Sequence, residues 1–523
     1  MGSGLYHYFG VAAGLMAEAS GGLLPSGCST LSLSINVDGL PISRSSRKQF
    51  WPVLVLVKES RGQNPFVAAL YEGDGKPENV ELFMKDFVEE LSVSLTQGIH
   101  LNSKLYTVKL HSFICDAPAR AYLKCIKGHT AYYGCEKCSQ KGKHDGKKVT
   151  FPDIDAPLRT DEDFTNQVNA DHHHAVPPLS ALGVGLVSCF PLDYMHLVCL
   201  GVMRRLIVQY WTSPTPSASK LPIRSQLEIS DKLISFQSST PCEFNRKPRS
   251  LKERDHWKAV EFRSFLLYFG PVLLRSNLDK HFYAHFLKLS CAMTILASPK
   301  FFLTHCDVAE SLLREFVRDA GSLYGDGVYV YNVHSLIHLT QDVRRFGPVD
   351  LFSAFPFENF LGKLKKMVRG RALALQQVIR KYSELNAATK TTREQQKCGM
   401  QGPHRDGPEP PNFEGTQYSE LLLDGTHLSL KPSDNCVQLK DGNIILVRNF
   451  IGSGKEQSIC GQFFQCLNNL YTTNVPSSEL GIFKATSLSR QYSLWSVKDI
   501  KCKCVCLQYQ QCYAVFPLVH LQV

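Results

Sequence analysis

The chain has 523 residues, of which 44% are hydrophobic and 20% are charged, and its formal net charge is +11. This composition is typical of a globular protein and excludes a chain that is mainly disordered or fibrous. The length exceeds what one hydrophobic core usually organises, so we expect two or three domains. The positive charge is compatible with a polyanionic partner.

Cysteine content and hydropathy indicate the compartment. The apolar stretch FGVAAGLMAEA near the start lacks the basic segment of a secretory signal. No apolar run reaches the roughly 18 residues of a membrane span, so we expect no membrane partner. The 18 cysteines are then expected to be buried thiols or metal ligands in a reducing compartment. Residues 1–30, rich in Gly, Ser and Ala, predict a flexible leader.

Residues 31–124 predict the first part of an α/β domain. The alternation in LSLSINVD predicts a strand that ends at Asp38, and FWPVLVLVK and NPFVAALYE predict two more. ENVELFMKDFVEELSVSL has helical spacing, and LYTVKLHSFICD predicts a fourth strand that ends at Asp116. A helical crossover lets the fourth strand pair parallel with the first. This order is that of an RNase H-like core, and it brings Asp38 and Asp116 toward one sheet edge.

The remaining sequence predicts four further segments. We expect a mostly helical insertion at 125–340, followed at 341–390 by a segment with Glu358 and a basic helix. Residues 391–425 have the Pro, Gly and polar bias of a linker. The alternation in 426–523 predicts a small β-rich domain.

Three carboxylates are candidates for a magnesium site. Asp38 and Asp116 end strands, and Glu358 lies in an apolar segment that opens the basic helix. Burying an unpaired carboxylate is costly, and a shared divalent cation removes that cost. Two such ions can support an in-line phosphoryl displacement. The alternative is three unrelated acids that form turns or cap a helix.

Two pairs of thiols and imidazoles predict a zinc site. Cys135 and Cys138 form a CxxC, and His334 and His338 lie one helical turn apart. Together they make a ligand set typical of structural zinc, joined across about two hundred residues. The alternatives are core histidines and a local site formed by Cys125, His129, Cys135 and Cys138.

Basic residues flank the expected carboxylate site and predict contacts with DNA phosphates. A solvated helix face is the alternative. Near the C-terminus, Cys502, Cys504 and Cys506 alternate at strand period, which favours buried strand thiols over a second metal site. The predicted DNA-binding residues are Arg44, Arg47, Lys48, Lys363, Lys365, Lys366, Arg369 and Arg371.

Four sequence blocks, taken in order, resemble the CACTA-type (Tnp2-like) DDE transposases, a group whose signature is shared with the catalytic core of the V(D)J recombinase. The resemblance covers roughly residues 31–390. The blocks are NVDGLPISRSSRKQFWPVL, FICDAPARAYLKCIKGHTAYYGCEKC, PLDYMHLVCLGVMRRL and HSLIHLTQDVRRFGPVDLFSAFPFENFLGKLKKMVRG.

The resemblance implies a role for each matched residue. It makes Asp38, Asp116 and Glu358 the catalytic triad that binds Mg²⁺ or Mn²⁺, and it assigns Asp193 and His196 to supporting roles. It makes Cys135, Cys138, His334 and His338 the zinc ligands.

The family's chemistry is cleavage of double-stranded DNA followed by strand transfer, with the nucleus as the location and a homodimer by analogy. Such proteins usually carry a DNA-binding region ahead of the core, so we expect an N-terminally truncated form. Two alternatives are a non-enzymatic DNA- or chromatin-binding protein derived from a transposase, and an RNase H-like nuclease that acts on RNA.

Overall fold

The computed structural model describes residues 4–43, 47–370, 372–388, 399–409, 415–453 and 456–520. The chain forms two compact units, each built from two separate segments. The first combines Met1–Val198 with Gly325–Arg393, and the second combines Cys199–Tyr324 with Glu394–Gln522. Among the described helices, none has both the length and the apolar composition needed to cross a membrane.

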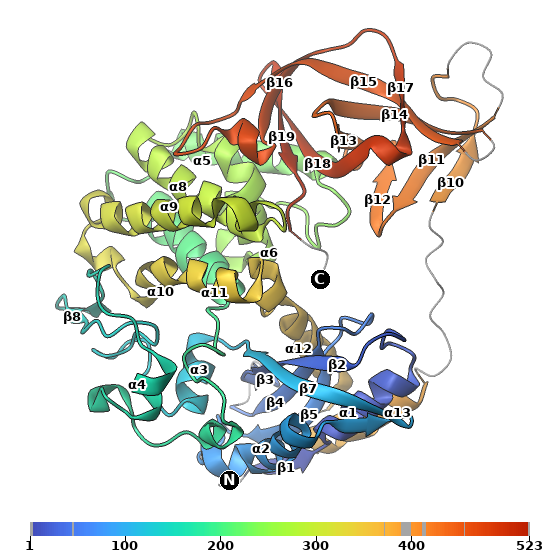
Figure 1. The fold of residues 1–523 in the computed structure, drawn as a ribbon. Coiled ribbons are helices and arrows are strands. Elements are labelled where there is room, and N and C mark those ends of the chain that lie inside the picture. Colours follow the sequence, from blue (N-terminus) through green and yellow to red (C-terminus); the bar gives the residue numbers. More distant parts are fainter. Residues whose placement is uncertain are drawn as a thin grey trace. The chain divides into compact units, whose positions relative to one another are not determined.

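A mixed β-sheet forms the centre of the first unit (Figure 1). Its strand order is β1-β5-β4-β2-β7-β6, with the short β3 beside β4. The strand β7 pairs parallel with β2, whereas β2, β4 and β5 pair antiparallel. The strands are β1 (Leu5–Tyr8), β2 (Thr30–Val37), β3 (Leu40–Pro41), β4 (Gln49–Val57), β5 (Phe66–Gly73), β6 (Ile99–Leu101) and β7 (Lys104–Phe113).

The four predicted strands and the parallel pairing of the first with the fourth are confirmed. The start of the chain differs from the flexible leader that we expected. The strand β1 pairs with β5, and the helix α1 (Val11–Ser20) buries Val11 and Leu15 in the core of the sheet. Apolar residues at helical spacing within FGVAAGLMAEA explain this packing.

Both faces of the strand β2 are covered. Its apolar residues enter the main core together with Phe83 and Phe87 of α2 (Val80–Gln97). Ser34 and Asn36, on the face that alternation predicts as polar, are also buried. They form hydrogen bonds with the strand β7 and the segment after it, as in Asn36 Nδ2 to Ile114 O at 2.7 Å. The Ser34 hydroxyl and the Asn36 Nδ2 are therefore paired, whereas the buried Asn36 Oδ1 has no hydrogen-bond partner among the described residues.

The predicted basic helix of the first unit is two helices, α12 (Phe355–Met367) and α13 (Ala374–Ala388). The backbone of Val368 is extended and ends α12 before Gly370. A short hairpin is formed by β8 (Lys143–His144) and β9 (Val149–Thr150). The other helices are α3 (Ala117–Leu123), α4 (Asp161–Thr165), α10 (Tyr331–Ser335) and α11 (Leu339–Phe346).

The second unit begins with a helical part. This part corresponds to the middle of the insertion predicted at 125–340, while residues 125–198 and 325–340 belong to the first unit. Two π-helical segments, η3 (Met195–Met203) and η4 (Leu206–Trp211), lead into it. Its helices are α5 (Ile223–Ser235), α6 (Ala259–Ser264), α7 (Gly270–Leu273), α8 (Lys280–Ala297) and α9 (Phe301–Tyr324).

The predicted β-rich C-terminal region is confirmed, and its strands begin within the expected linker. Six of them form a closed antiparallel ring in the order β14-β13-β18-β19-β16-β15, because β15 pairs back with β14. The strands are β10 (Gly399–His404), β11 (Thr416–Leu423), β12 (Thr426–Ser429), β13 (Cys436–Leu439), β14 (Ile444–Ser453), β15 (Glu456–Asn469), β16 (Phe483–Leu488), β17 (Ser493–Ser496), β18 (Ile500–Tyr509) and β19 (Cys512–Pro517).

Candidate metal centre and carboxylate site

The three candidate carboxylates lie where elements of the first unit begin or end. Asp38 directly follows β2. Asp116 follows β7 and caps α3, where its Oδ1 accepts a hydrogen bond from Ala119 N at 2.8 Å. Glu358 lies in the first turn of α12. Because β2 and β7 are parallel neighbours, the two aspartates lie at the same edge of the sheet.

The charges of these carboxylates act on one another. Asp38, His196 and Glu358 each offer a potential ligand atom, and these atoms lie within 4.8 Å of one another. Burial, followed by the negative charges of Asp116 and Glu358, raises the pKa of Asp38 to about 7. The charge of Asp116 therefore influences the pKa of Asp38, although Asp116 is not part of the group formed by Asp38, His196 and Glu358. The side chain of Glu358 is 42% exposed, so solvent reaches the site.

Asp193 and His196 connect this site to the rest of the unit. His196 Nδ1 lies 2.6 Å from Asp193 Oδ2, and its Nε2 lies 3.9 Å from Glu358 Oε1. Although burial lowers it, the hydrogen bond and the charge of Asp193 raise the pKa of His196 to about 9. The imidazole is therefore cationic at neutral pH. Asp193 itself is buried and also accepts a hydrogen bond from Ala354 N at 2.7 Å.

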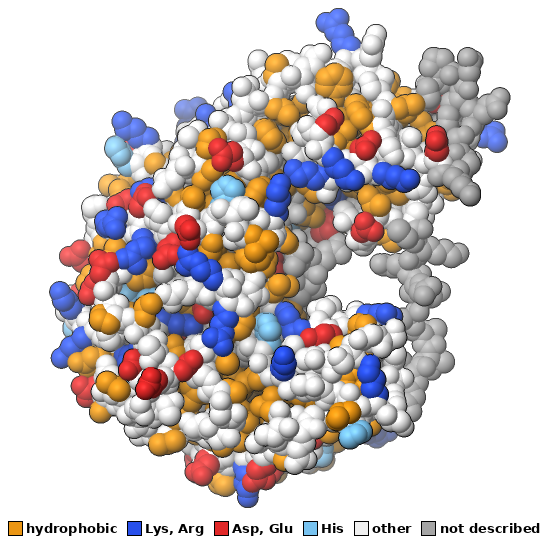
Figure 2. Space-filling model, viewed as in Figure 1, with side chains coloured by type: hydrophobic (Ala, Val, Ile, Leu, Met, Phe, Trp, Pro, Cys, Tyr) orange, Lys and Arg blue, Asp and Glu red, His pale blue; other side chains and the backbone are white. Residues whose placement is uncertain are grey.

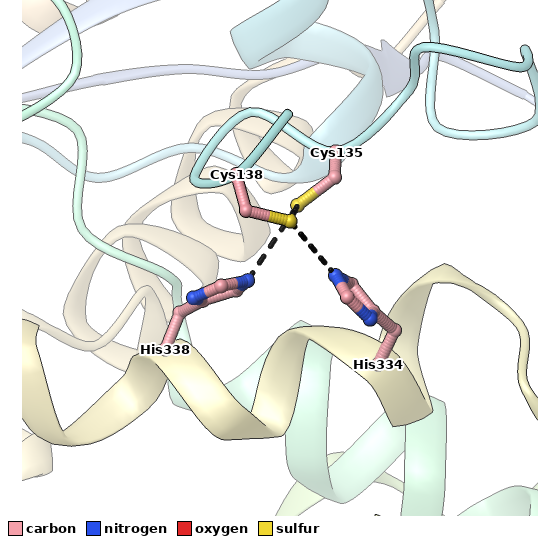
Figure 3. Close-up of side chains that lie close together, drawn as sticks. All are labelled: Cys135, Cys138, His334 and His338. Atoms are coloured by element: carbon pink, nitrogen blue, oxygen red, sulfur yellow. Dashed lines mark hydrogen bonds between the residues drawn. The ribbon is translucent and has the colours of Figure 1, made fainter. Parts of the chain in front are cut away.

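The predicted thiols and imidazoles form a second, buried group. Figure 3 shows that the side chains of Cys135 and Cys138 point toward those of His334 and His338. The cysteines come from the loop after α3, and the histidines come from α10 and from the single turn that follows it. All four residues are at most 2% exposed. The group could hold a metal ion, and its composition is compatible with zinc.

The distances within this group are close to, and in one case slightly shorter than, those of a tetrahedral zinc site. The two sulfurs are 3.5 Å apart, and the sulfur–nitrogen distances are 3.3 Å for Cys138 and His334 and 3.7 Å for Cys135 and His338. Zinc–sulfur bonds of about 2.3 Å and zinc–nitrogen bonds of about 2.0–2.1 Å give ligand separations of about 3.5–3.8 Å. Although burial opposes it, the Cys138 hydrogen bond and then the two imidazoles lower the pKa of Cys135.

The local alternative with Cys125 and His129 is not formed. The thiol of Cys125 is directed to Tyr122 O at 3.9 Å, and the ring of His129 packs against that of Tyr331. The two cysteines of the CxxC are instead grouped with the distant histidines.

Both residues between the cysteines are buried ion-pair partners, which we did not predict. The signal was present in the sequence, because a CxxC that holds Glu136 and Lys137 places two charges beside a buried site. Opposite charges from other segments compensate both residues. The contacts are Arg120 Nε to Glu136 Oε1 (2.6 Å), Lys124 Nζ to Glu136 Oε2 (3.0 Å), Tyr331 OH to Glu136 Oε1 (2.7 Å) and Lys137 Nζ to Asp342 Oδ1 (2.9 Å).

The predicted DNA-binding residues are exposed where the structure describes them. Lys363 Nζ donates to Asn64 Oδ1 at 3.1 Å, and Lys365 Nζ donates to Pro41 O at 2.7 Å. Figure 2 shows lysine and arginine side chains interspersed with acidic ones on the visible face. The exposed set is Arg47, Lys48, Lys363, Lys365, Lys366 and Arg369, whereas Arg44 and Arg371 lie outside the described residues.

A further acidic group in the second unit contains an internal cation. Cys242, His427 and Asp434 have potential ligand atoms within 4.8 Å of one another. The ammonium of Lys503 lies 2.5 Å from Asp434 Oδ1, 2.7 Å from Glu243 Oε2 and 3.8 Å from Cys242 Sγ. The buried lysine therefore supplies the positive charge that a metal ion would otherwise provide.

Cys504 and Cys506 are buried strand thiols, as predicted, whereas Cys502 is only half-buried. Cys504 and Cys506 lie in a hydrophobic cluster together with Cys436 and Phe464, and Cys502 packs against this cluster.

A comparison with family models finds a match in the C-terminal part of this chain. The model of a family described as a domain of unknown function (DUF8592) matches residues 403–518, which cover most of the β-rich region. No curated protein matches the chain.

Proposed function

We propose that this protein is a DNA-cleaving and strand-transferring enzyme of the CACTA-type (Tnp2-like) DDE transposase group. The observation that carries the proposal is that Asp38 and Asp116 follow neighbouring parallel strands, and that Asp38 and Glu358 have potential ligand atoms within 4.8 Å of each other. The strand arrangement supports an RNase H-like scaffold, because three antiparallel strands precede a helix and a parallel strand. The sequence resemblance assigns catalysis to the same three residues.

The donor set of this site fits a hard divalent cation. Carboxylate oxygens are ligands that Mg²⁺ and Mn²⁺ prefer. Burial and then the negative charges of Asp116 and Glu358 raise the pKa of Asp38, and a bound cation would offset both effects. When bound, such ions stabilise the attacking and leaving oxygens of an in-line displacement at phosphorus. In this proposal Asp38, Asp116 and Glu358 bind the cation and orient it.

The proposed reaction has two displacements at one site. In the first, water attacks a phosphodiester and breaks its bond to the 3′-oxygen, which leaves a 3′-hydroxyl and a 5′-phosphate. In the second, that 3′-hydroxyl attacks a phosphodiester of another DNA segment, forms a new bond to its phosphorus and displaces that segment's own 3′-oxygen as a hydroxyl. His196, oriented by Asp193, lies with its Nε2 3.9 Å from Glu358 Oε1. Exposed lysines on α12, such as Lys363 and Lys366, position phosphates without reading bases. Joining two DNA ends suggests a homodimer, and DNA as the substrate suggests the nucleus.

Zinc is proposed for the buried Cys135, Cys138, His334 and His338 group, whose distances are close to those of a zinc site. Bound there, it would tie the loop after α3 to α10 within the first unit. Its proposed role is structural, because all four ligands are protein side chains and the group is buried.

Nicking of supercoiled DNA tests the proposed function. The zinc-loaded protein is incubated with plasmid and Mg²⁺ or Mn²⁺, alongside Glu358→Gln and Asp38→Asn. We expect metal-dependent nicking by the unaltered protein and only background nicking by both variants. Glu384→Gln, an exposed glutamate on α13 that pairs with Arg380, is the matched control and should nick normally.

Two outcomes would favour the alternatives. If the folded protein binds DNA but neither nicks it nor binds Mn²⁺, a non-enzymatic DNA-binding protein is supported. The cationic His196 favours that alternative, because it compensates part of the acidic charge without a metal ion. Cleavage of RNA in preference to DNA under the same conditions would indicate a nuclease of the RNase H type.

A further inference from the structure

We propose that Glu136 and Arg120 couple the buried thiol–imidazole centre to the carboxylate site. In this role Glu136 is a positioning residue, and occupancy of the buried centre raises the affinity of the carboxylate site for divalent cations. The inference rests on the proposed function, since it assumes that Asp38, Asp116 and Glu358 bind such ions.

The first contacts join Arg120 to both halves of the buried centre. Glu136 lies between the two cysteines, and Tyr331 lies one helical turn before His334. Arg120 Nε is 2.6 Å from Glu136 Oε1, and its Nη2 donates to the Tyr331 hydroxyl at 3.0 Å. That hydroxyl donates in turn to Glu136 Oε1 at 2.7 Å. A metal ion that joins the cysteines to the histidines thereby holds both partners of Arg120 together.

The next contacts join Arg120 to the backbone beside the aspartates. Its Nη1 donates to Cys115 O at 2.6 Å, and Cys115 Sγ accepts a hydrogen bond from Val37 N at 3.3 Å. Cys115 directly precedes Asp116, and Val37 directly precedes Asp38. One guanidinium group therefore contacts the metal-ligand loop, the histidine helix and the strand end that carries Asp116.

Because they are buried, the contacts of Arg120 can transmit a displacement from one site to the other. Arg120 and Glu136 are each 3% exposed, and Cys115 is fully buried. In such surroundings a displaced ion-pair partner is not replaced by water, so a shift of the loop moves its partners. Coupling between sites through such contacts commonly changes affinity by about tenfold, and the change is reciprocal.

The test compares Mn²⁺ binding in five zinc-loaded full-length proteins, namely the unaltered protein, Glu136→Gln, Arg120→Lys, Glu261→Gln and Asp38→Asn. Mn²⁺ is titrated by electron paramagnetic resonance, because this hard ion competes poorly for thiolate sites. We expect Glu136→Gln and Arg120→Lys each to weaken Mn²⁺ binding at the carboxylate site by about tenfold. In a parallel sample, Co²⁺ replaces zinc, and its thiolate absorption should be unchanged in both variants. Glu261→Gln, which removes the charge that pairs with the half-buried Arg249 in the second unit, should leave Mn²⁺ affinity within about twofold.

The outcomes distinguish this inference from the proposed function. If the unaltered protein and Asp38→Asn bind Mn²⁺ equally, the carboxylate site and the coupling are both wrong. If Asp38→Asn loses Mn²⁺ but both coupling variants bind it normally, only the coupling is overturned. If Glu136→Gln loses the cobalt absorption, its Mn²⁺ affinity no longer tests the coupling. The Mn²⁺ affinity of Arg120→Lys then tests it, because Arg120 has no hydrogen bond to any of the four metal ligands.

Discussion

The carboxylate of Asp193 accepts a hydrogen bond from the backbone nitrogen of Ala354 at 2.7 Å. Ala354 is the N-cap of α12, and its carbonyl accepts the hydrogen bond of Glu358 N at 2.9 Å. The same carboxylate orients His196. One buried side chain therefore fixes both the helix that carries the third carboxylate and the imidazole that faces it.

Removing this side chain should disturb stability and metal binding together. Asp193→Ala leaves a protonated His196 and the start of α12 without their shared acceptor, so we expect a loss of about 3–5 kcal/mol in stability. Mn²⁺ affinity should fall as well. Urea unfolding and Mn²⁺ titration measure the two effects. The control is Asp319→Ala, whose pair with Lys288 is partly exposed and should cost under about 1 kcal/mol. Equal losses in both variants would contradict this role.

Substitution of one distant histidine should remove the buried metal. His334→Ala deletes a ligand, so we expect the zinc content and the cobalt–thiolate absorption to be lost and the first unit to be destabilised. His129→Ala, at the local site that the sequence also allowed, should keep both signals. The long-range centre is wrong if zinc stays in the first variant and leaves the second.

The second unit should lose stability in mild acid because of His285. Its Nε2 donates to Phe316 O at 2.8 Å, and its buried Nδ1 has no hydrogen-bond partner among the described residues. Burial lowers the pKa of His285 to about 4, with Asp319 and Lys288 as the nearby charges, whereas the unfolded value is about 6.5. Between pH 6.5 and pH 4, His285 is therefore protonated in the unfolded chain but neutral in the folded protein.

The contribution of neutral His285 to the free energy of unfolding is fully present above pH 6.5 and decreases as the pH falls toward 4. Between pH 7 and 5 the loss from this group is roughly 2 kcal/mol. Urea unfolding over that range measures it, and His285→Gln, which does not titrate, should flatten the profile by that amount. An unchanged slope in the variant would assign the pH dependence to other groups.

The exposed lysines of α12 should contribute to DNA affinity mainly through charge. Replacing Lys363 and Lys366 together with alanine should weaken binding to any sequence and reduce the salt dependence, log Kd against log salt, by about 2. Lys280→Ala, an exposed lysine of the second unit, is the control for net charge alone. DNA binding is measured from low to moderate salt for each protein. If the plot of log Kd against log salt for the double variant is displaced but keeps the slope of the unaltered protein, the two lysines do not contact phosphates.

The sequence was most informative where residues close in the chain form one element. Alternation placed β2, and the parallel pairing with β7 followed from the helix between the third and fourth strands. The spacing within CxxC and HxxxH identified both halves of the buried centre. Their residue types suggested one zinc site, but nothing in local spacing relates Cys138 to His334, so the choice over core histidines or a local site rested on the family resemblance.

Features that depend on tertiary packing were not predicted. The burial of Ser34 and Asn36 depends on hydrogen bonds with β7 and the segment after it, which alternation cannot show. The break at Val368 interrupts a sequence that reads as one helix. Lys503 is separated from Glu243 by most of the second unit, so their buried ion pair has no local signal.

The division of each unit into two segments has a consequence for synthesis on the ribosome. When residue 198 has emerged, the first unit still lacks α10 to α13 and the third carboxylate. When residue 324 has emerged, the helices of the second unit still lack the strands that follow residue 394. Neither unit can complete its core from one continuous stretch of the chain. The first segment of each unit therefore exposes apolar surface until its second segment has been synthesised. We expect the yield of soluble protein to depend on chaperones that bind such surfaces during translation.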